Sequence, residues 1–353
     1  MPSSEEDRTA VAAEQLGSMS LGESAERKAE PDTEDATKPA KLFCSSCGEE
    51  GDALKKCRAC KCAWYCDKDC QNRHWKEHKK ECRRIKKVLD ERGGKLDLGT
   101  ELDLGLPLPD LPPQEECAIC MRVLPFHGKL RNHFDCCGKT ICGGCNLQHL
   151  MKSNEQAVRP TCAFCREPIP QSEEGYLAQL GKRVELKDPG ALYDMAIIYG
   201  YGERGFPVDQ TKCIDLLRES ADLGFPNAQH TLGSFHKDGL MGLQQNVEEG
   251  LKYLEAAAEV GYVYALHNLG NAEERRSNYV AAMRHWRLSA SGGSKLTTNK
   301  LIRYFEHGLL HHDDLAETLR AFYRSRAELR SADRDYYMEH LKEIGEYKEV
   351  YDM

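Results

Sequence analysis

Cysteine is unevenly distributed along this sequence, and its distribution limits what the chain can fold into. Sixteen of the seventeen cysteines lie between Cys44 and Cys165, and the remaining one is Cys213. A disulfide-stabilised secreted protein would not normally leave half of its length unbridged. In a reducing compartment, clustered cysteines bind metal more often than they form disulfides. We therefore expect two compact cysteine-rich modules followed by a domain of another kind.

The remaining composition is that of an intracellular protein, cytoplasmic or nuclear. With 353 residues, of which 40% are hydrophobic and 30% charged, the chain can form two or three compact units. Its first residues, MPSSEEDRTAVAAEQ, lack the basic, apolar and small-residue order of a signal peptide. No apolar run approaches the roughly 20 residues that cross a bilayer. We expect no membrane partner.

Charge differs between the parts of the chain. Residues 1–40 carry ten acidic and four basic side chains and no aromatic residue, which predicts a disordered acidic tail. Residues 41–92 carry fifteen basic and nine acidic side chains. If seven cysteines there are thiolates around two zinc ions, the net charge of this segment falls from +6 to +3. Such a weakly positive segment gives little reason to expect a nucleic-acid partner.

Eight residues of the first module form four pairs with metal-ligand spacing. They are Cys44, Cys47, Cys57, Cys60, Cys66, Cys70, His78 and Cys82. Two cysteines separated by two residues can direct both sulfurs to one tetrahedral ion from a tight turn. His78 and Cys82 are four residues apart, so on a helix they share one face. About 40 residues cannot build an adequate apolar core, and a structural zinc ion supplies about 10–16 kcal/mol at neutral pH.

This spacing closely resembles the MYND-type zinc finger, including the letters "WYC" at Cys66 and the histidine and cysteine at the end. The resemblance covers 44–82 and implies two structural zinc sites, each with four protein ligands and no open coordination position. It also implies a module that binds short proline-containing peptides. It also implies interleaved ligands: Cys44, Cys47, Cys66 and Cys70 for one ion, and Cys57, Cys60, His78 and Cys82 for the other. Two residues are left over. Cys62 could compete with Cys60 but is expected to be a small packed thiol, and His74 could replace His78, whose spacing matches the family.

The second module again has eight cysteines, in three pairs with two-residue gaps and one adjacent pair. They are Cys117, Cys120, Cys136, Cys137, Cys142, Cys145, Cys162 and Cys165. The pattern resembles a RING finger from Cys117 to about Pro168. The resemblance implies that the first and third pairs share one zinc ion and that the second and fourth share another. Lys139 stands where the usual histidine would fall, so we favour Cys136 with Cys137, and His133 or Asp135 remains an alternative partner for one of them.

The RING resemblance implies the activity of a ubiquitin ligase that has no nucleophile of its own. Such ligases dock a ubiquitin-conjugating enzyme and fix its thioester-linked ubiquitin for attack, which is catalysis by orientation. By resemblance, Ile119 matches the apolar docking position and Arg166 matches the cation that bridges the conjugating enzyme and ubiquitin. Two positions depart from the family. The usual tryptophan of the docking groove is His149, and the proline of the last pair is Ala163.

From about Asp188 the sequence becomes helical in pattern and repeats itself. Ala191, Ala228 and Ala265 recur at steps of 37 residues, and the second helices of the repeats all end in glycine, at Gly224, Gly261 and Gly293. Small residues let paired helices approach, and glycine accepts a left-handed cap. The pattern resembles Sel-like repeats, relatives of the tetratricopeptide repeat, which present a concave face to protein partners. Cys213 aligns with Gly250 and Ala282, so we expect a small packing residue there.

The predicted fold is a set of small zinc-stabilised modules followed by an all-α helical-repeat solenoid. The expected parts are a tail at 1–40, a MYND finger at 41–92, a linker at 93–115, a RING finger at 116–170, a linker at 171–187, repeats at 188–297 and capping helices at 298–353. Four structural zinc ions are expected.

The sequence leaves two functions open: a RING-type ubiquitin ligase that selects its substrate through the finger and the repeats, and a non-enzymatic scaffold of the corepressor type. A methyltransferase with an embedded MYND finger is not expected, because nothing else here resembles that enzyme.

The first linker generates a testable hypothesis about self-recognition. Its sequence LGLPLPDLPPQEE contains Pro109, Leu111 and Pro113 in the spacing of the Pro-x-Leu-x-Pro ligand that some MYND fingers bind. A proline-stiffened spacer explains the same residues. If the finger binds this linker in the same or a neighbouring chain, Leu111→Ala will shift the finger's amide resonances and reduce self-association. Unchanged shifts and association would leave the spacer interpretation.

Overall fold

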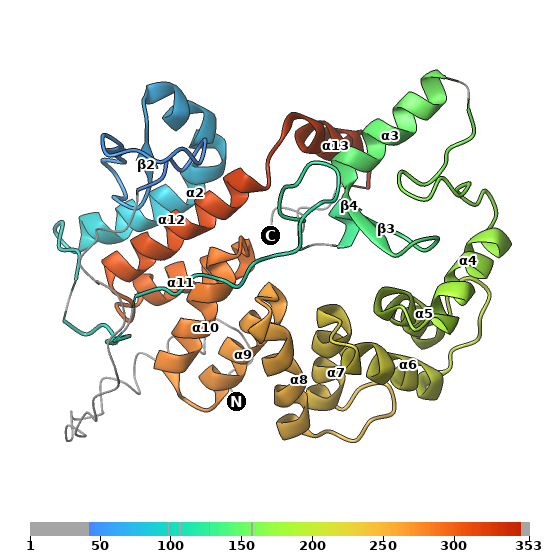
Figure 1. Ribbon diagram of the computed structural model, residues 1–353. Coiled ribbons are helices and arrows are strands. Elements are labelled where there is room, and N and C mark those ends of the chain that lie inside the picture. Colours follow the sequence, from blue (N-terminus) through green and yellow to red (C-terminus); the bar gives the residue numbers. More distant parts are fainter. Residues whose placement is uncertain (1–41, 98, 106, 127, 157, 347–353) are drawn as a thin grey trace, which may run out of the picture. The chain divides into compact units, whose positions relative to one another are not determined.

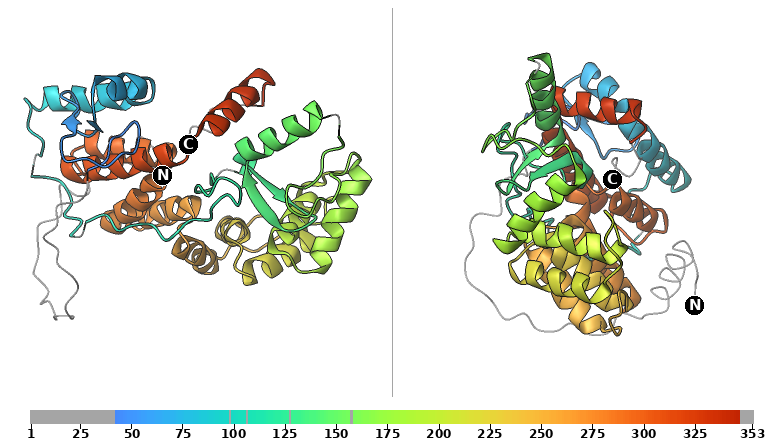
Figure 2. Two further views of the ribbon diagram at one scale, coloured as in Figure 1. Left: turned by 45° about the horizontal axis from the view of Figure 1, so that its top comes forward. Right: turned by 90° about the vertical axis from the view of Figure 1, so that its right-hand side faces the viewer.

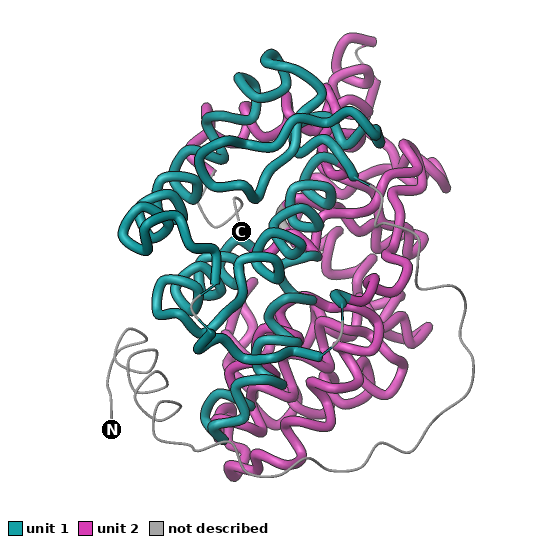
Figure 3. The backbone as a smooth tube through the Cα atoms, turned by 90° about the vertical axis from the view of Figure 1, so that its left-hand side faces the viewer, with its two compact units in different colours: residues 1–108, 273–291, 295–327 teal, residues 109–272, 292–294, 328–353 magenta. Residues whose placement is uncertain are grey.

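The computed structural model of the protein describes residues 42–97, 99–105, 107–126, 128–156 and 158–346 (Figure 1). The expected acidic tail at 1–40 lies outside the described residues. The chain divides into two compact units (Figure 3). Unit 1 runs up to Leu108 and includes 273–291 and 295–327, and unit 2 contains 109–272, 292–294 and the chain from Glu328 onward. Within the described ranges, no helix has both the length and the apolar character of a membrane span.

Unit 1 combines the first cysteine module with helices that come much later in the sequence. Its elements are β1 (Lys55–Lys56), β2 (Trp64–Tyr65), α2 (Lys68–Glu91), α10 (Tyr279–Ser291), α11 (Lys295–Glu306) and α12 (His312–Glu328). The last residue of α12 belongs to unit 2. β1 and β2 form a short antiparallel pair, and α2 packs against α11. Ile85 of α2 belongs to the same buried core as Trp286, Phe305 and Leu319. The first cysteine module therefore shares a hydrophobic core with the helices of this unit.

Unit 2 begins with the second cysteine module, which is a hairpin followed by a helix. Its elements are η1 (Gly128–Leu130), β3 (Arg131–Phe134), β4 (Lys139–Cys142) and α3 (Gly143–Glu155). β3 and β4 pair antiparallel, with Phe134 opposite Lys139. α3 packs against α13 (Ala332–Glu343), the last described helix. A side chain at Gly144 would come within 2.7 Å of the Asp333 backbone, so glycine is what permits this close approach.

The rest of unit 2 is an array of successive helices, each packed on the next (Figures 1 and 2). These are α4 (Glu173–Glu185), α5 (Pro189–Tyr201), α6 (Gln210–Asp222), α7 (Pro226–Asp238), α8 (Val247–Glu259) and α9 (Val263–Arg275), the last three residues of which belong to unit 1. The alanines that recur at steps of 37 residues, Ala191, Ala228 and Ala265, are fully buried. The prediction of a helical-repeat solenoid behind zinc modules is thus confirmed.

Local sequence signals account for the ends of the repeat helices. Asp188, Asp209 and Asn246 each cap the helix that follows by accepting a backbone N–H three residues ahead. The expected left-handed glycines follow the second helices, with φ of 83° at Gly224 and 77° at Gly261. Because a left-handed residue reverses the chain direction at low cost only in glycine, these positions separate consecutive helices cleanly.

Three features differ from or add to the sequence-based expectations. The segment 171–187, expected as a linker, contains α4, which packs on α5. α13 lies in the region expected to cap the repeats, but it packs on α3 of the second cysteine module. Cys213 is fully buried, and its sulfur would lie 2.8 Å from a side chain at Gly200, so its role as a small packing residue is confirmed.

The close contact between α7 and α8 leads to a stability prediction. A Cβ at Gly250 would lie 2.6 Å from the Gly233 carbonyl oxygen and 2.7 Å from the Lys237 nitrogen, and backbone atoms cannot move aside cheaply. Gly250→Ala should therefore destabilise the array by about 1–3 kcal/mol. The matched control is Gly181→Ala in α4, where nothing lies within 4 Å and alanine should stabilise by about 0.5–1 kcal/mol.

Thermal unfolding followed by circular dichroism measures both effects. A Gly250→Ala midpoint at or above that of the natural protein would contradict the helix packing described here. A Gly181→Ala midpoint that falls as far as that of Gly250→Ala would show that the loss is not specific to the α7–α8 contact.

Candidate metal centres

The structure brings sixteen ligand-type residues together as four groups of four. Within each group all ligand atoms lie within 4.8 Å of one another. The groups are Cys44, Cys47, Cys66 and Cys70; Cys57, Cys60, His78 and Cys82; Cys117, Cys120, Cys142 and Cys145; and Cys136, Cys137, Cys162 and Cys165. These are the same four sets that the sequence resemblances imply. In each module, therefore, the first and third pairs meet and the second and fourth pairs meet.

Four cysteine pairs adopt one common turn, although they lie in different parts of the chain. The backbone N–H four residues after the first cysteine donates to that cysteine's carbonyl oxygen. The donors and acceptors are Gly48 to Cys44 (2.9 Å), Lys61 to Cys57 (3.0 Å), Met121 to Cys117 (2.9 Å) and Arg166 to Cys162 (3.2 Å). The donor residue is left-handed each time, with φ of 78°, 62°, 53° and 61° in that order. This turn, which we call the knuckle, directs both sulfurs of a pair to the same side.

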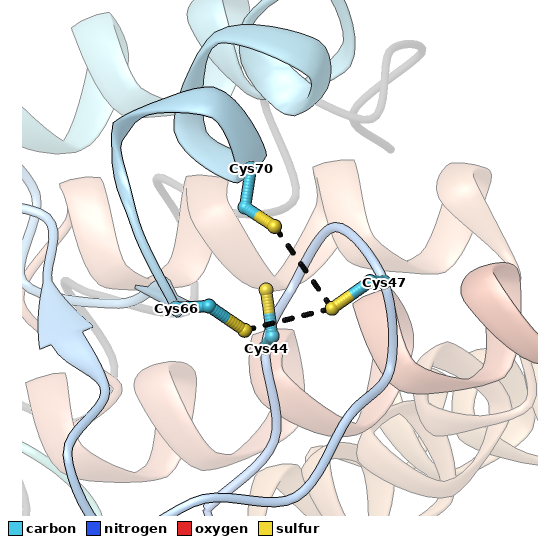
Figure 4. Close-up of side chains that lie close together, drawn as sticks. All are labelled: Cys44, Cys47, Cys66 and Cys70. Carbon is cyan, nitrogen blue, oxygen red and sulfur yellow. Dashed lines mark hydrogen bonds between the residues drawn. The ribbon is translucent and has the colours of Figure 1, made fainter.

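The first group shows how separate elements meet at one point (Figure 4). Cys44 and Cys47 come from the first knuckle, Cys66 follows β2, and Cys70 lies in the first turn of α2. Asp67 fixes the start of α2 because its side chain accepts the Cys70 backbone N–H at 2.7 Å. The four sulfurs point toward one another.

The distances between ligand atoms fit a zinc ion. Sulfurs bound at about 2.3 Å to a tetrahedral ion lie about 3.8 Å from one another. The sulfurs of Cys47 and Cys66 are 3.6 Å apart, and those of Cys57 and Cys82 are 3.8 Å apart. In the second module, Cys120 and Cys142 are separated by 3.9 Å, and Cys137 and Cys162 by 3.6 Å. Each group thus has the donor type of a structural zinc site and at least one sulfur–sulfur distance that fits it.

Backbone N–H groups around the first cysteine of a knuckle favour its thiolate form. Burial alone would raise the pKa of Cys44, but backbone N–H groups of Cys47, Ser46 and Cys66 outweigh it and lower the pKa to about 7. Cys117 is in the same situation: backbone hydrogen bonds oppose burial and lower its pKa to about 7. Because zinc binds the thiolate and not the thiol, these hydrogen bonds prepare the sites for metal.

The two leftover residues of the first module lie beside the second group but outside it. Cys62 is fully buried, and its sulfur lies 3.2 Å from the Cys60 carbonyl oxygen, in agreement with a small packed thiol. The Nδ1 atom of His74 lies 3.0 Å from the Tyr65 hydroxyl. The ligand position on the helix is occupied instead by His78, whose Nε2 lies 3.4 Å from Cys60 Sγ.

Adjacent Cys136 and Cys137 both face the fourth group because they lie in the turn between β3 and β4. The backbone N–H groups of Cys137 and Gly138 both donate to the Phe134 carbonyl oxygen, and Gly138 is left-handed at φ 71°. The alternative ligand His133 is directed elsewhere. Its Nδ1 lies 3.2 Å from the Thr140 hydroxyl, and its Nε2 lies 3.6 Å from an Asp188 carboxylate oxygen. The other alternative, Asp135, belongs to none of the four groups.

The predicted partner-binding residues lie at the surface of unit 2. Ile119 is 46% exposed on the third knuckle, and Arg166 is exposed on the last one. Pro109 and Pro113 are exposed and Leu111 is half-buried. Between and beyond them, Pro112 and Gln114 lie against Gly261 of the repeats, and Gln114 donates to the Val260 carbonyl oxygen at 3.3 Å. This part of the linker therefore runs along the turn between α8 and α9.

Sequence reasoning missed three residues that touch the ligands from far along the chain. Tyr323 and His312 of α12 contact the second group, and Arg334 of α13 contacts the third. Separations of more than 200 residues leave no local spacing that would reveal such contacts.

The ligand sets predict how much zinc the protein carries and which substitutions change it. Purified protein should contain four zinc equivalents by elemental analysis. Cys60→Ser should lower the content by one, because sulfur is lost from a closed four-ligand site. Cys62→Ser is the matched control, two residues away, and should retain all four. Retention of four equivalents in Cys60→Ser together with loss in Cys62→Ser would reverse the assignment of ligand and packed thiol.

Comparison with known proteins identifies two kinds of module. The MYND finger model matches residues 44–82, and the Sel1 repeat model matches 189–225, 226–262 and 263–294. Over 35 residues the chain is 54% identical to a SET and MYND domain-containing protein of Dictyostelium discoideum, covering 10% of this chain and 6% of that protein. Over 46 residues it is 46% identical to a histone-lysine N-methyltransferase of Mus musculus, covering 13% and 9%. The matches thus span less than a tenth of these curated relatives.

Two solved structures are also similar. A Sel1 repeat protein from Oxalobacter formigenes is 25% identical, with a TM-score of 0.33, over 36% of this chain and 96% of that one. A protective antigen of uropathogenic Escherichia coli is 19% identical, with a TM-score of 0.39, over 51% of this chain and 43% of that one. By the family models, residues 44–82 form a zinc-binding MYND finger and residues 189–294 form Sel1 repeats, so the chain combines two kinds of protein-interaction module.

Proposed function

We propose that this protein is a zinc-dependent adaptor whose second cysteine module, residues 116–170, is a RING-type finger that recruits a ubiquitin-conjugating enzyme. In this proposal the MYND finger and the Sel1 repeats select the protein to be modified. Each cysteine module carries two of four structural zinc ions. The site of action is the cytoplasm or the nucleus.

The observation that carries the proposal is the interleaved arrangement of the second module. Cys117 and Cys120 meet the third cysteine pair, while Cys136 and Cys137 meet the fourth. Between these pairs lie a β-hairpin and a helix, β3, β4 and α3. The RING resemblance implies this crossed connectivity, and the same pairing in the two cysteine groups of the module supports the proposal.

Orientation is the chemistry that such a module performs. Zinc supplies only the cross-links that hold the two knuckles in place. Ile119 then offers an exposed aliphatic side chain to a conjugating enzyme, and Arg166 offers a cation that can hold ubiquitin against it. Holding the thioester in an attack-ready pose accelerates transfer because rotational freedom is lost before the reaction. No group of this chain needs to act as a nucleophile.

The competing function is a non-enzymatic scaffold, and two positions favour it. His149 replaces the tryptophan of the usual docking groove, and its Nε2 lies 2.7 Å from the Thr161 carbonyl oxygen, so its polar edge is engaged within the module. Ala163 replaces the usual proline and gives a smaller apolar contact. Methyltransferase activity is not proposed, because the similarity to the histone-lysine N-methyltransferases extends over only about a tenth of their length.

An autoubiquitination assay with the full chain distinguishes ligase from scaffold. With a panel of conjugating enzymes, ubiquitin and ATP, we expect chain formation with at least one enzyme. Ile119→Ala and Arg166→Ala should each reduce it by about tenfold or more, since interface hot spots contribute about 2 kcal/mol or more. Val158→Ala, which shortens another exposed aliphatic residue of the same module, should leave it unchanged.

Zinc content must be measured alongside, so that loss of activity is separated from loss of fold. If no enzyme of the panel supports ubiquitin-chain formation although four zinc ions are bound, the result would favour the scaffold. Equal activity in Ile119→Ala and the natural protein would reject the assigned docking surface.

A further inference from the structure

Tyr323 of α12 contacts the imidazole of a zinc ligand in unit 1. His78 Nε2 lies 3.4 Å from Cys60 Sγ and so faces the sulfurs, while its Nδ1 lies 3.0 Å from the Tyr323 hydroxyl oxygen. His78 is fully buried, and the two rings meet nearly edge-on, with centroids 5.7 Å apart. If His78 binds zinc through Nε2, its Nδ1 carries the proton and donates a hydrogen bond to the hydroxyl oxygen of Tyr323.

A second residue of α12 contacts the knuckle of the same site. His312 is fully buried, and its Nε2 lies 2.9 Å from the Cys60 carbonyl oxygen and 3.3 Å from Cys62 Sγ. If Nε2 carries the proton, it donates to the carbonyl of a ligand residue. Two side chains from one helix thus hold both a ligand ring and the loop that presents another ligand.

In unit 2, Arg334 of α13 approaches the sulfurs of the third group. It is 6% exposed, its Nη1 donates to the Val123 carbonyl oxygen at 2.8 Å, and its Nη2 lies 3.5 Å from Cys120 Sγ. Gly143 and Gly144 make this possible, because a side chain at either would collide with α13. Four thiolates around one zinc ion carry a net negative charge, and a buried guanidinium reduces the cost of that charge.

We propose that side chains of α12 and α13 contact the zinc ligands on the side away from the metal. Tyr323 positions His78, and Arg334 supports Cys120. Retention of zinc then depends on the last quarter of the chain as well as on the ligands. Hydrogen bonds to the far side of a ligand fix its tautomer and direction, and their loss lowers metal affinity by about 10–100-fold. The part that concerns Tyr323 rests on the MYND finger alone. The part that concerns Arg334 rests on the proposed zinc binding of the second module.

The test exposes the full chain to a chelator for short times, alkylates the released thiols and maps them by peptide mass spectrometry. In Tyr323→Phe, Cys57, Cys60 and Cys82 should be labelled about tenfold faster or more, while the second-module cysteines keep their rate. The control is Tyr304→Phe, which removes another buried hydroxyl of unit 1, one that donates to Glu274 at 2.6 Å. It should not accelerate labelling of any zinc site.

A spectroscopic readout separates positioning from simple packing. In an NMR spectrum that correlates nitrogen-15 with its attached proton, the Nδ1 proton of His78 should give a resonance that exchanges slowly with water. The reason is that this proton is buried and hydrogen-bonded in the natural protein. Tyr323→Phe should remove that protection, while the aromatic ring that the substitution retains preserves the packing. Equal labelling rates in Tyr323→Phe and the natural protein, or equal acceleration in Tyr304→Phe, would overturn the proposal for Tyr323.

For α13 the matched pair is Arg334→Gln and Arg330→Gln. Arg330 is an exposed arginine just before the same helix, paired with Asp335 at 3.4 Å. Arg334→Gln should speed labelling of the third group only, Arg334→Lys should restore part of the protection, and Arg330→Gln should behave as the natural protein. Uniform acceleration at all four sites would indicate general destabilisation and reject a specific role.

Zinc content separates failure of this inference from failure of the proposed function. Two zinc equivalents instead of four in the natural protein would remove the second-module zinc and the Arg334 role with it. Tyr323 would still be judged by its own variant.

Discussion

Tetrahedral coordination by pairs of ligands is the constraint on which the MYND finger depends, and in our proposal the second cysteine module depends on it as well. A knuckle can deliver only two ligands, so every site needs a second pair from elsewhere in the module. Because consecutive pairs bind alternate ions, the two pairs of one site are separated in sequence by a pair of the other site. Neither site can be completed until the chain between its two pairs has folded. In the second module that segment is the β3–β4 hairpin and α3, which lie between the pairs that meet. Coordination thus fixes topology where few apolar residues are present to do so.

The metal sites are nevertheless not isolated from the hydrophobic interior. In unit 1, Cys57, Cys60 and Cys82 lie in the same buried core as Phe305 and Leu319. Zinc therefore supplies direction and the helices supply burial. Burial also matters for the ligands, because hydrogen bonds to sulfur and to imidazole are stronger where water is excluded. Tyr323 is only 3% exposed, which makes its hydroxyl an effective partner for His78.

The sequence predicted what depends on short spacings. The cysteine pairs, the face shared by His78 and Cys82 on α2, and the recurring alanines of the repeats are all periodicities within a few dozen residues, and each follows from the geometry of a turn or a helix. What could not be predicted is which distant helices cover the modules. The helix α13 looks like one more cap of the repeats, yet it packs on α3, because Gly143 and Gly144 leave room for it there. A pair of glycines after a cysteine also suits a turn, so their role in packing is invisible without the partner helix.

The left-handed residues of the knuckles connect strain with function. The first knuckle uses Gly48, which adopts φ 78° without cost, whereas the others use Lys61, Met121 and Arg166 at φ between 53° and 62°. A non-glycine residue in this conformation costs on the order of 1 kcal/mol, and a bound zinc ion offsets that easily. Glycine would remove the strain at these three positions. Met121 is 67% exposed and Arg166 is exposed as well, so neither is explained by packing in the core. The knuckles of the second module thus place strained side chains at the surface, and one of them, Arg166, is the residue to which the proposed function assigns contact with ubiquitin.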